Sequence, residues 1–238
     1  MTGEPHHPDG ASAPVDVSPT PAAATVFTGR LGLAEQFVSL LATDGVDHGH
    51  LGPRETPRLW ERHLVNSALV TDLLPEGARV VDIGSGAGLP GIPMAIRRAD
   101  LRLDLVEPML RRTRFLESSV ATLGLTEQVR VVRGRADDPS VIDRVGSSNW
   151  VVARAVAPLD RLVRWCRPLL APGGRLLALK GASATDEVEE HRAALSRLGA
   201  VEITVDELGA DLGSESTWVV QVTRSTRAST RRPARRAR

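Results

Sequence analysis

The chain has 238 residues, enough for one sizeable domain with appendages or at most two small ones. Its 42% hydrophobic content can form a packed core, but only 3% of the residues are aromatic, so aliphatic side chains must do most of the packing. A single cysteine, Cys166, excludes a disulfide framework and a cysteine-rich zinc site, and we expect no metal. No segment approaches the roughly 20 apolar residues of a membrane span, and the N-terminus lacks the features of a secretion signal. We therefore expect a cytoplasmic protein without membrane contact.

Charge is unevenly distributed along the chain. The net charge is +1, but residues 224–238 carry seven arginines and no acidic residue, which leaves −6 on residues 1–223. An arginine-rich tail on an acidic body is typical of a disordered arm that contacts nucleic-acid phosphates; the alternative is a solvated tail that only improves solubility. Lys180 is the only lysine among the 30 basic residues, which hints that its position needs a compact ammonium rather than a planar guanidinium.

The N-terminal part predicts a tail followed by a small helical unit. Residues 1–27 are rich in Pro, Ala, Ser and Thr without periodicity, and we expect them to be disordered. Apolar residues at helical spacing predict one helix that ends at Gly45 and a second over residues 55–74. We interpret residues 28–76 as a helical cap that precedes the main domain.

Apolar runs alternate with amphipathic helices from residue 78 onward, and we assign residues 77–223 to one domain. The alternation predicts an α/β fold with a parallel, doubly wound sheet, Rossmann-like in arrangement. The last two strands are too close in sequence for a crossover helix, so we expect an antiparallel hairpin at the sheet edge, as in class I methyltransferases. The predicted strands cover residues 79–84, 101–107, 129–134, 149–156, 174–181, 201–208 and 216–223, and the helices start near Pro90, Met109, Val141, Leu159 and Thr185.

A glycine-rich turn follows the first strand of this domain. Gly84, Gly86 and Gly88 let the backbone turn sharply and approach a ligand closely. Counted from the strand end, a dinucleotide-binding GxGxxG pattern would require glycine at its third position, where this chain has Leu89. The turn therefore favours S-adenosylmethionine, which has no phosphate, over NAD. Asp82 beside the turn is a candidate anion for the methionine ammonium, directly or through water.

Two further segments bear on the cofactor. Glu107 ends the second strand, where a carboxylate can accept the ribose hydroxyls of either NAD or S-adenosylmethionine. The segment "LLAPGGRLLALKG" over residues 169–181 predicts a helix that ends in a Pro-Gly-Gly turn and leads into a buried strand. This arrangement is typical of class I methyltransferases, so methyl transfer is favoured over hydride transfer.

Several motifs together resemble the 16S ribosomal RNA guanine-N7 methyltransferase family, also called methyltransferase G or glucose-inhibited division protein B. The resemblance covers roughly residues 29–222 and implies that Gly84 and Leu89 line the cofactor site, that Ala136 and Asp137 meet the adenine, and that Arg154 closes the site. It also implies that the product is 7-methylguanosine in the decoding-region loop of 16S rRNA. The motifs are "RHLVNS" (residues 62–67), "DIGSGAGLPGIP" (82–93), "RRTRFL" (111–116), "ARAVAPL" (153–159) and "ALKG" (178–181).

Some positions depart from the family pattern, among them the segment "LGPRETPRLWE" (residues 51–61) before "RHLVNS". Asn66 stands where the family commonly has Asp, and Val156 and Pro158 replace the aromatic and small residues that usually follow Arg154.

Residue types that are absent limit the atom that can be methylated. Exocyclic amine methylation typically uses an Asn/Asp-Pro-Pro-aromatic loop after the fourth strand, and "ARAVAPL" has none. Pyrimidine C5 methylation needs a cysteine nucleophile, whereas Cys166 lies among apolar neighbours in a predicted helix. Guanine N7 carries a free lone pair and no proton, so it needs alignment rather than a general base. We therefore expect no catalytic acid or base.

Basic residues provide candidate contacts to an RNA substrate. Arg154 and Lys180 each end a strand at its carboxyl edge, where ligands bind in such folds, and we assign both to phosphate or guanine O6. Arg62 and His63 lie on the cap helix facing the same cleft; for His63 the alternative is a structural histidine bonded to nearby backbone. The arginines of "RRTRFL" either follow the RNA backbone or form a solvated helix face.

The leading hypothesis is a monomeric S-adenosylmethionine-dependent enzyme that methylates a guanine N7 in 16S rRNA or the small ribosomal subunit. A small-molecule methyltransferase on the same fold is the second hypothesis, although the low aromatic content disfavours its usual pocket. A non-catalytic RNA-binding assembly factor is the third, and hydride transfer on NAD is a distant fourth.

Overall fold

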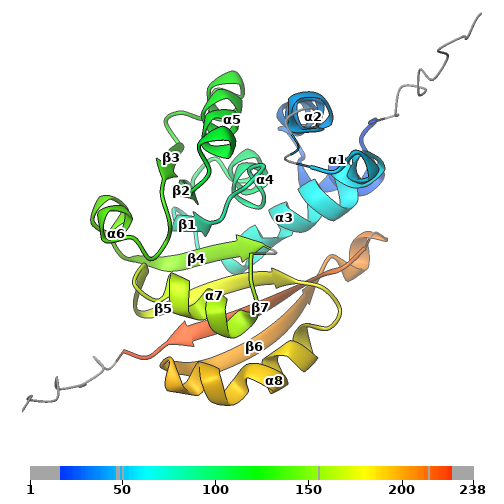
Figure 1. The fold of residues 1–238 in the computed structure, drawn as a ribbon. Coiled ribbons are helices and arrows are strands. Elements are labelled where there is room, and N and C mark those ends of the chain that lie inside the picture. The colour runs from blue at the N-terminus through cyan, green and yellow to red at the C-terminus, as the bar shows by residue number, and fades with distance from the viewer. Residues whose placement is uncertain (1–16, 47–48, 50, 155, 214, 227–238) are drawn as a thin grey trace, which may run out of the picture.

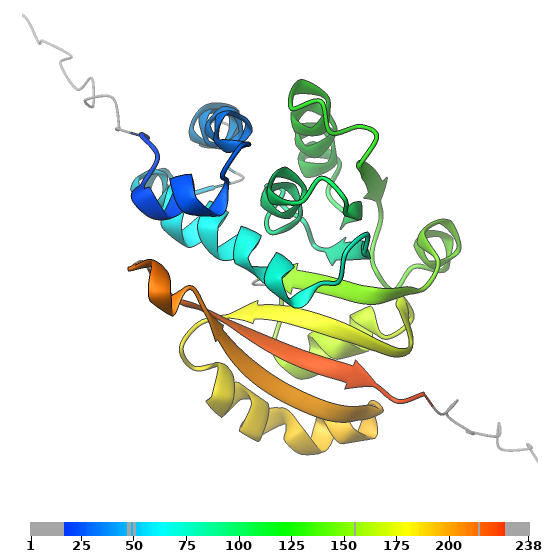
Figure 2. The same ribbon diagram turned by 180° about the vertical axis from the view of Figure 1, so that it is seen from behind.

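The computed structural model describes residues 17–46, 49, 51–154, 156–213 and 215–226. Within them a seven-stranded sheet has the order β3-β2-β1-β4-β5-β7-β6, and helices cover both of its faces (Figures 1 and 2). This arrangement confirms the predicted α/β doubly wound fold. The strands are β1 (Arg79–Ile83), β2 (Arg102–Glu107), β3 (Val129–Arg133), β4 (Ser148–Arg154), β5 (Leu170–Lys180), β6 (Ala200–Leu208) and β7 (Thr217–Arg224).

Six strands run in the same direction, and β7 runs opposite to them. The pairs β1–β2, β2–β3, β1–β4 and β4–β5 are parallel, whereas β7 is inserted between β5 and β6 and runs antiparallel to both. The predicted antiparallel hairpin at the edge is thereby confirmed. The connecting helices are α4 (Gly91–Arg97), α5 (Leu110–Thr122), α6 (Pro139–Val145), α7 (Leu159–Cys166) and α8 (Ala184–Arg197).

The period of two along each strand divides the core into two layers. On β4, Val152 packs into the layer built with the N-terminal helices, α4 and α5, while Val151 and Ala153 pack into the layer built with α6, α7 and α8. Strand β5 repeats this division with Leu177 on the first face and Leu176 on the second. The strands are buried on both faces, which explains their nearly continuous apolar runs.

The N-terminal helices pack beside α4 on one face of the sheet (Figures 1 and 2). The second predicted cap helix is not continuous but forms successive 3₁₀, π and α turns. Pro57 lies within the first 3₁₀ segment, where it cannot donate a backbone hydrogen bond. None of the described helices is long and apolar enough to cross a bilayer. The segments are α1 (Pro21–Val26), α2 (Leu31–Leu40), η1 (Leu41–Gly45), η2 (Pro53–Arg58), η3 (Leu59–Val65), α3 (Asn66–Leu69) and η4 (Val70–Leu73); a further 3₁₀ turn, η5 (Ala210–Leu212), precedes β7.

The expectation of disorder over residues 1–27 is wrong for the part that the structure describes. Thr20 caps helix α1 by accepting from the backbone N–H of Ala23 at 3.2 Å. Phe27 is 1% exposed, and the Trp60 indole donates to the Val17 carbonyl at 2.6 Å. The segment is ordered because its few apolar side chains are buried by the cap, which composition does not reveal. Residues 1–16 lie outside the described residues, and disorder there stays a prediction.

Two other predicted boundaries change. Pro172, Gly173 and Gly174 lie inside β5, where the register against β4 shifts, so they form an irregularity in the strand rather than a turn before it. Arg224 belongs to β7 and donates to the Arg167 carbonyl at 3.2 Å, so the predicted arginine-rich tail does not begin at residue 224. Residues 227–238 lie outside the described residues.

Burial of Phe27 gives a test of the ordered N-terminal segment. We expect Phe27→Ala to lower the free energy of unfolding by about 3–5 kcal/mol, because it leaves a cavity in the core. Urea unfolding measures the change, with Val201→Ala as the control. Val201 is 65% exposed, and its truncation should change stability by less than about 0.5 kcal/mol. Equal small effects of both substitutions would contradict the packing of this segment.

Candidate active site

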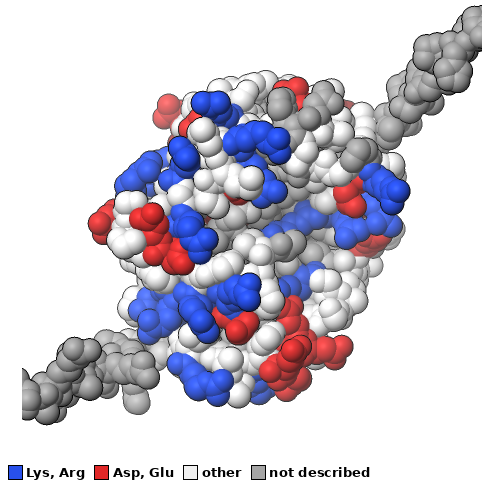
Figure 3. All heavy atoms as spheres, viewed as in Figure 1, with Lys and Arg blue, Asp and Glu red and all other residues white. Residues whose placement is uncertain are grey.

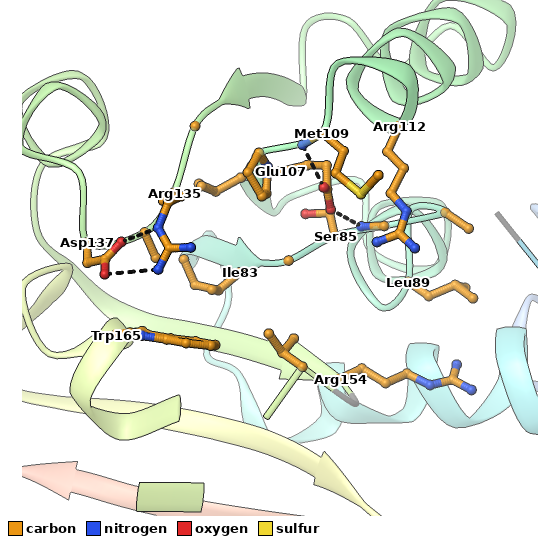
Figure 4. Close-up of a pocket in the computed structure, with 18 of the residues that line it drawn as sticks. Ile83, Ser85, Leu89, Glu107, Met109, Arg112, Arg135, Asp137, Arg154 and Trp165 are labelled. Atoms are coloured by element: carbon orange, nitrogen blue, oxygen red, sulfur yellow. Dashed lines mark hydrogen bonds and ion pairs between the residues drawn. The ribbon is translucent and has the colours of Figure 1, made fainter. Parts of the chain in front are cut away.

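A cavity of about 500 Å³ opens at the carboxyl ends of the central parallel strands (Figure 4). This is the edge at which ligands bind in doubly wound folds. Most of the residues that the sequence singled out line it: His63, Gly84, Gly86, Leu89, Glu107, Ala136, Asp137 and Arg154. The other four, Asp82, Gly88, Arg62 and Lys180, do not line it.

The glycine-rich turn after β1 forms the inner wall of the cavity. Gly84 has φ +69°, and a Cβ there would lie 2.9 Å from a methyl of Val156, so a side chain would both strain the turn and displace the opposite wall. Gly88 serves packing instead, because a Cβ there would meet the Ile92 side chain at 2.5 Å. The turn therefore brings bare backbone up to the cavity.

Asp82 lies beneath the turn and not in the cavity, which corrects its predicted role as an anion facing the ligand. Its carboxylate is fully buried, and Oδ2 accepts from the backbone N–H of Gly91 at 3.1 Å, while Oδ1 has no hydrogen-bond partner among the described residues. Burial raises the pKa of Asp82 to about 7. Gly91 fits because a Cβ there would lie 2.8 Å from Oδ2. Asp82 thus fixes the start of α4.

Glu107 connects the two loops that border the cavity. Its Oε2 accepts from the backbone N–H of Gly86 at 3.0 Å, and its Oε1 accepts from that of Met109 at 2.9 Å (Figure 4). The side chain is 1% exposed, yet it lines the cavity. Each carboxylate oxygen can accept a second hydrogen bond, so the group can receive two neighbouring hydroxyls. This donor set fits a ribose.

A flat apolar wall lies at the far end of the cavity from Arg154. It includes Ile83, Ala136 and the indole of Trp165, and the Arg135 guanidinium lies 5.8 Å from the centre of that ring (Figure 4). Asp137 pairs with Arg135 at 3.0 Å. These surroundings suit a planar ring such as adenine.

The sequence interpretation singled out neither Arg135 nor Trp165 as a candidate site residue. The sequence did contain a signal for Trp165. Aromatic residues are rare in this chain, and this tryptophan lies beside the buried apolar stripe of α7 rather than within it, where it can face a ligand.

A continuous hydrogen-bonded chain joins the cap to β4. His63 Nε2 lies 2.8 Å from Glu55 Oε2, and Arg154 Nη2 lies 2.6 Å from His63 Nδ1. Arg154 Nη1 also donates to the His63 carbonyl and to Ser67 Oγ, at 3.2 and 3.1 Å. A guanidinium has no acceptor, so Nδ1 must accept and Nε2 must carry the proton. His63 is therefore neutral and bonded to side chains, unlike the backbone-bonded histidine of the alternative interpretation.

The pKa values agree with this assignment. Burial, and then the charge of Arg154, lower the pKa of His63 to about 4. Burial also lowers the pKa of Arg154, to about 10, which leaves its guanidinium charged at neutral pH. Since the His63 lone pair is engaged by Arg154, the imidazole is not available as a general base.

A second cavity of about 700 Å³ lies on the other side of Arg154, which lines both. It lies where the cap meets the end of β5 and the start of β7. Three of the four residues predicted to contact substrate meet here, although Arg62 and Lys180 do not reach the first cavity. The residues that line the second cavity are Arg62, Asn66, Arg154, Leu179, Lys180, Gly181, Ala182, Glu215, Ser216, Thr217 and Trp218.

Lys180 is engaged within the protein, which revises its predicted role. Its ammonium donates to Glu187 Oε1 at 2.7 Å and to the Ala157 carbonyl at 3.2 Å. Glu187 Oε1 also accepts from the Leu159 backbone N–H at 2.8 Å. Lys180 therefore fastens the segment after β4 to α8, and a compact ammonium suits the space between a carbonyl and a carboxylate.

Basic side chains border the hollow between the cap and the sheet (Figure 3). Of the three arginines in "RRTRFL", Arg112 lines the first cavity. Arg111 and Arg114 line a separate groove between α5 and the end of α2. The positive charge at the mouth of the first cavity suits a polyanionic partner.

The His63 chain gives a prediction for the pH dependence of stability. The pKa of His63 is about 4 in the folded protein and 6.5 ordinarily, so on acidification the unfolded chain takes up a proton before the folded protein does. His63 should therefore reduce stability as the pH falls below 6.5, by roughly 2 kcal/mol between pH 7 and pH 5.

Urea unfolding at several pH values, compared with His63→Gln, isolates this contribution. Glutamine does not titrate but keeps an acceptor for Arg154. The opposing effect of Asp82, whose raised pKa favours the folded state at low pH, cancels in the comparison. Parallel curves for the two proteins would contradict a neutral, buried His63.

Comparisons with known proteins agree with this geometry. A family model described as rRNA small subunit methyltransferase G matches residues 30–215. Proteins named ribosomal RNA small subunit methyltransferase G from Salinispora arenicola and Mycobacterium marinum are 51% and 53% identical over 229 and 216 residues, covering 93% and 90% of this chain and 94% and 92% of their own.

Two solved structures are similar in fold alone. The S-adenosylmethionine-dependent methyltransferase SibL has a TM-score of 0.56 at 18% identity, over 86% of this chain and 70% of its own. A putative O-methyltransferase from Nostoc punctiforme has a TM-score of 0.54 at 13% identity, over 85% of this chain and 69% of its own. The matched family model and the identities to these relatives show that the chain belongs to the rRNA small subunit methyltransferase G family.

Proposed function

We propose that this chain transfers the methyl group of S-adenosylmethionine to N7 of a guanine in the decoding-region loop of 16S rRNA. Membership of the rRNA small subunit methyltransferase G family supports the reaction type and the rRNA substrate. The observation that carries the proposal is the pair of cavities that share Arg154, one with a carboxylate that suits a ribose and one bordered by basic side chains. We propose further that the enzyme acts in the cytoplasm and as a monomer.

The first cavity has groups that suit each part of the cofactor. Glu107 receives the ribose hydroxyls, and the wall formed by Ala136 and Trp165 receives the adenine. The bare turn at Gly84, next to Leu89, faces the methionine portion. When bound, S-adenosylmethionine supplies an electrophilic methyl group on its sulfonium.

The residues between the cavities position the acceptor rather than remove a proton from it. Guanine N7 has an in-plane lone pair, so no base is needed, and the neutral His63 is already occupied by Arg154. Arg154 donates to guanine O6 or to a neighbouring phosphate, because a cation directly at N7 would oppose the charge that develops on the purine. His63 and Ser67 hold its guanidinium in place for this task.

The carboxylate of Glu107 gives a prediction for cofactor affinity. We expect Glu107→Gln to weaken S-adenosylmethionine binding about 10- to 100-fold, because an amide cannot accept from both backbone donors and the ribose. Isothermal titration calorimetry measures the change. Glu117→Gln, an exposed substitution on the following helix α5, is the control and should leave affinity unchanged. Equal affinities in all three proteins would place the ribose elsewhere.

Methyl transfer itself is tested on RNA from a strain that lacks the enzyme. Small ribosomal subunits and deproteinised RNA are each incubated with the protein and methyl-labelled S-adenosylmethionine, then digested to nucleosides. We expect labelled 7-methylguanosine at one site, and the better of the two substrates indicates when modification occurs. Cofactor binding without labelled RNA would favour a small-molecule enzyme or a non-catalytic assembly factor.

A further inference from the structure

Asn66 is a buried polar residue in the wall of the second cavity. It begins α3, is 8% exposed, and its Oδ1 has no hydrogen-bond partner among the described residues. Leaving a buried carbonyl oxygen unpaired costs about 1–3 kcal/mol. Its neighbour Ser67 is satisfied, because its hydroxyl accepts from Arg154. The Asn66 oxygen can therefore accept a hydrogen bond from a ligand, since no donor in the described part of the protein reaches it.

The position of Asn66 relative to Arg154 indicates which donor fits. Arg154 lines both cavities, whereas Asn66 lines only the one beyond it. A guanine whose N7 faces the first cavity has O6 on the same side as N7, and its 2-amino group lies on the opposite edge of the ring. Since Arg154 and Asn66 both line the second cavity, such a guanine can place its O6 near Arg154 and its 2-amino N–H groups towards Asn66. The amide can turn about its terminal bond to present the oxygen without any movement of the backbone.

We propose that the second cavity holds the acceptor guanine and that Asn66 is a specificity-determining residue whose amide oxygen accepts a hydrogen bond from the 2-amino group. This inference rests on the proposed methyl transfer to guanine. Adenine also has an N7 but lacks a 2-amino group, so it would leave the Asn66 oxygen unpaired. A site that hydrogen-bonds a substrate N–H strongly rejects an analogue without it, because its own polar group is then left buried and unsatisfied.

The test compares RNA that carries guanosine at the target position with RNA that carries inosine there. Inosine lacks only the 2-amino group and keeps O6 and N7. For the wild-type enzyme we expect kcat/KM to be about tenfold or more higher on guanosine than on inosine. Asn66→Leu removes the acceptor at similar volume and should bring this ratio within about twofold of one. Asn66→Asp keeps an acceptor oxygen and should preserve the preference.

The outcomes separate the inference from the proposed function. No labelling of guanosine RNA by the wild type would overturn methyl transfer to guanine, and with it this role of Asn66. Normal labelling with an unchanged guanosine-to-inosine ratio in Asn66→Leu would overturn the role of Asn66 alone. Unchanged S-adenosylmethionine affinity verifies that the leucine variant is folded. If it does not fold, Asn66→Ala makes the same comparison, since it also removes the acceptor.

Discussion

The site depends on how the guanidinium of Arg154 is held. One carbonyl, one imidazole nitrogen and one hydroxyl from the cap receive its hydrogen bonds, all between 2.6 and 3.2 Å. These bonds cross from β4 to the segments around His63 and Ser67, so the cap and the sheet position the same side chain. Both cavities share this residue as a wall. A change in the packing of the cap would therefore alter both binding spaces together.

Electrostatics explain why the chain between Glu55 and Arg154 contains a histidine. The buried guanidinium of Arg154 needs hydrogen-bond acceptors, and the neutral imidazole of His63 provides one at Nδ1. Its Nε2 donates to the partly exposed carboxylate of Glu55. A protonated imidazole would be a buried charge beside a second cation, so burial and the charge of Arg154 each lower the pKa of His63. In this arrangement His63 cannot transfer protons, but it holds the charged guanidinium of Arg154 in a fixed position as a hydrogen-bond donor.

Short sequence motifs correctly predicted those parts of the site whose conformation depends on neighbouring residues in the chain. The turn at Gly84 needs a left-handed backbone that glycine adopts freely, and Glu107 ends a strand at the edge where ligands bind. Long-range packing decided the remainder. Asp82 is separated from the cavity by the way α4 starts above it, and Lys180 is engaged because α8 brings Glu187 to it. The segment before helix α1 is held by Trp60, far along the chain, whose indole donates to the Val17 carbonyl.

The rarity of aromatic residues has a practical consequence. The chain has four tryptophans and no tyrosine, so indoles dominate its ultraviolet emission. Trp165 lines the first cavity and Trp218 the second, while Trp60 is buried in the cap and Trp150 is half-buried on β4. In a variant that keeps only one of the two cavity tryptophans, a change in fluorescence on ligand binding would report on that cavity alone. Occupancy of each cavity, and the order in which they fill, then becomes readable in real time without any attached dye.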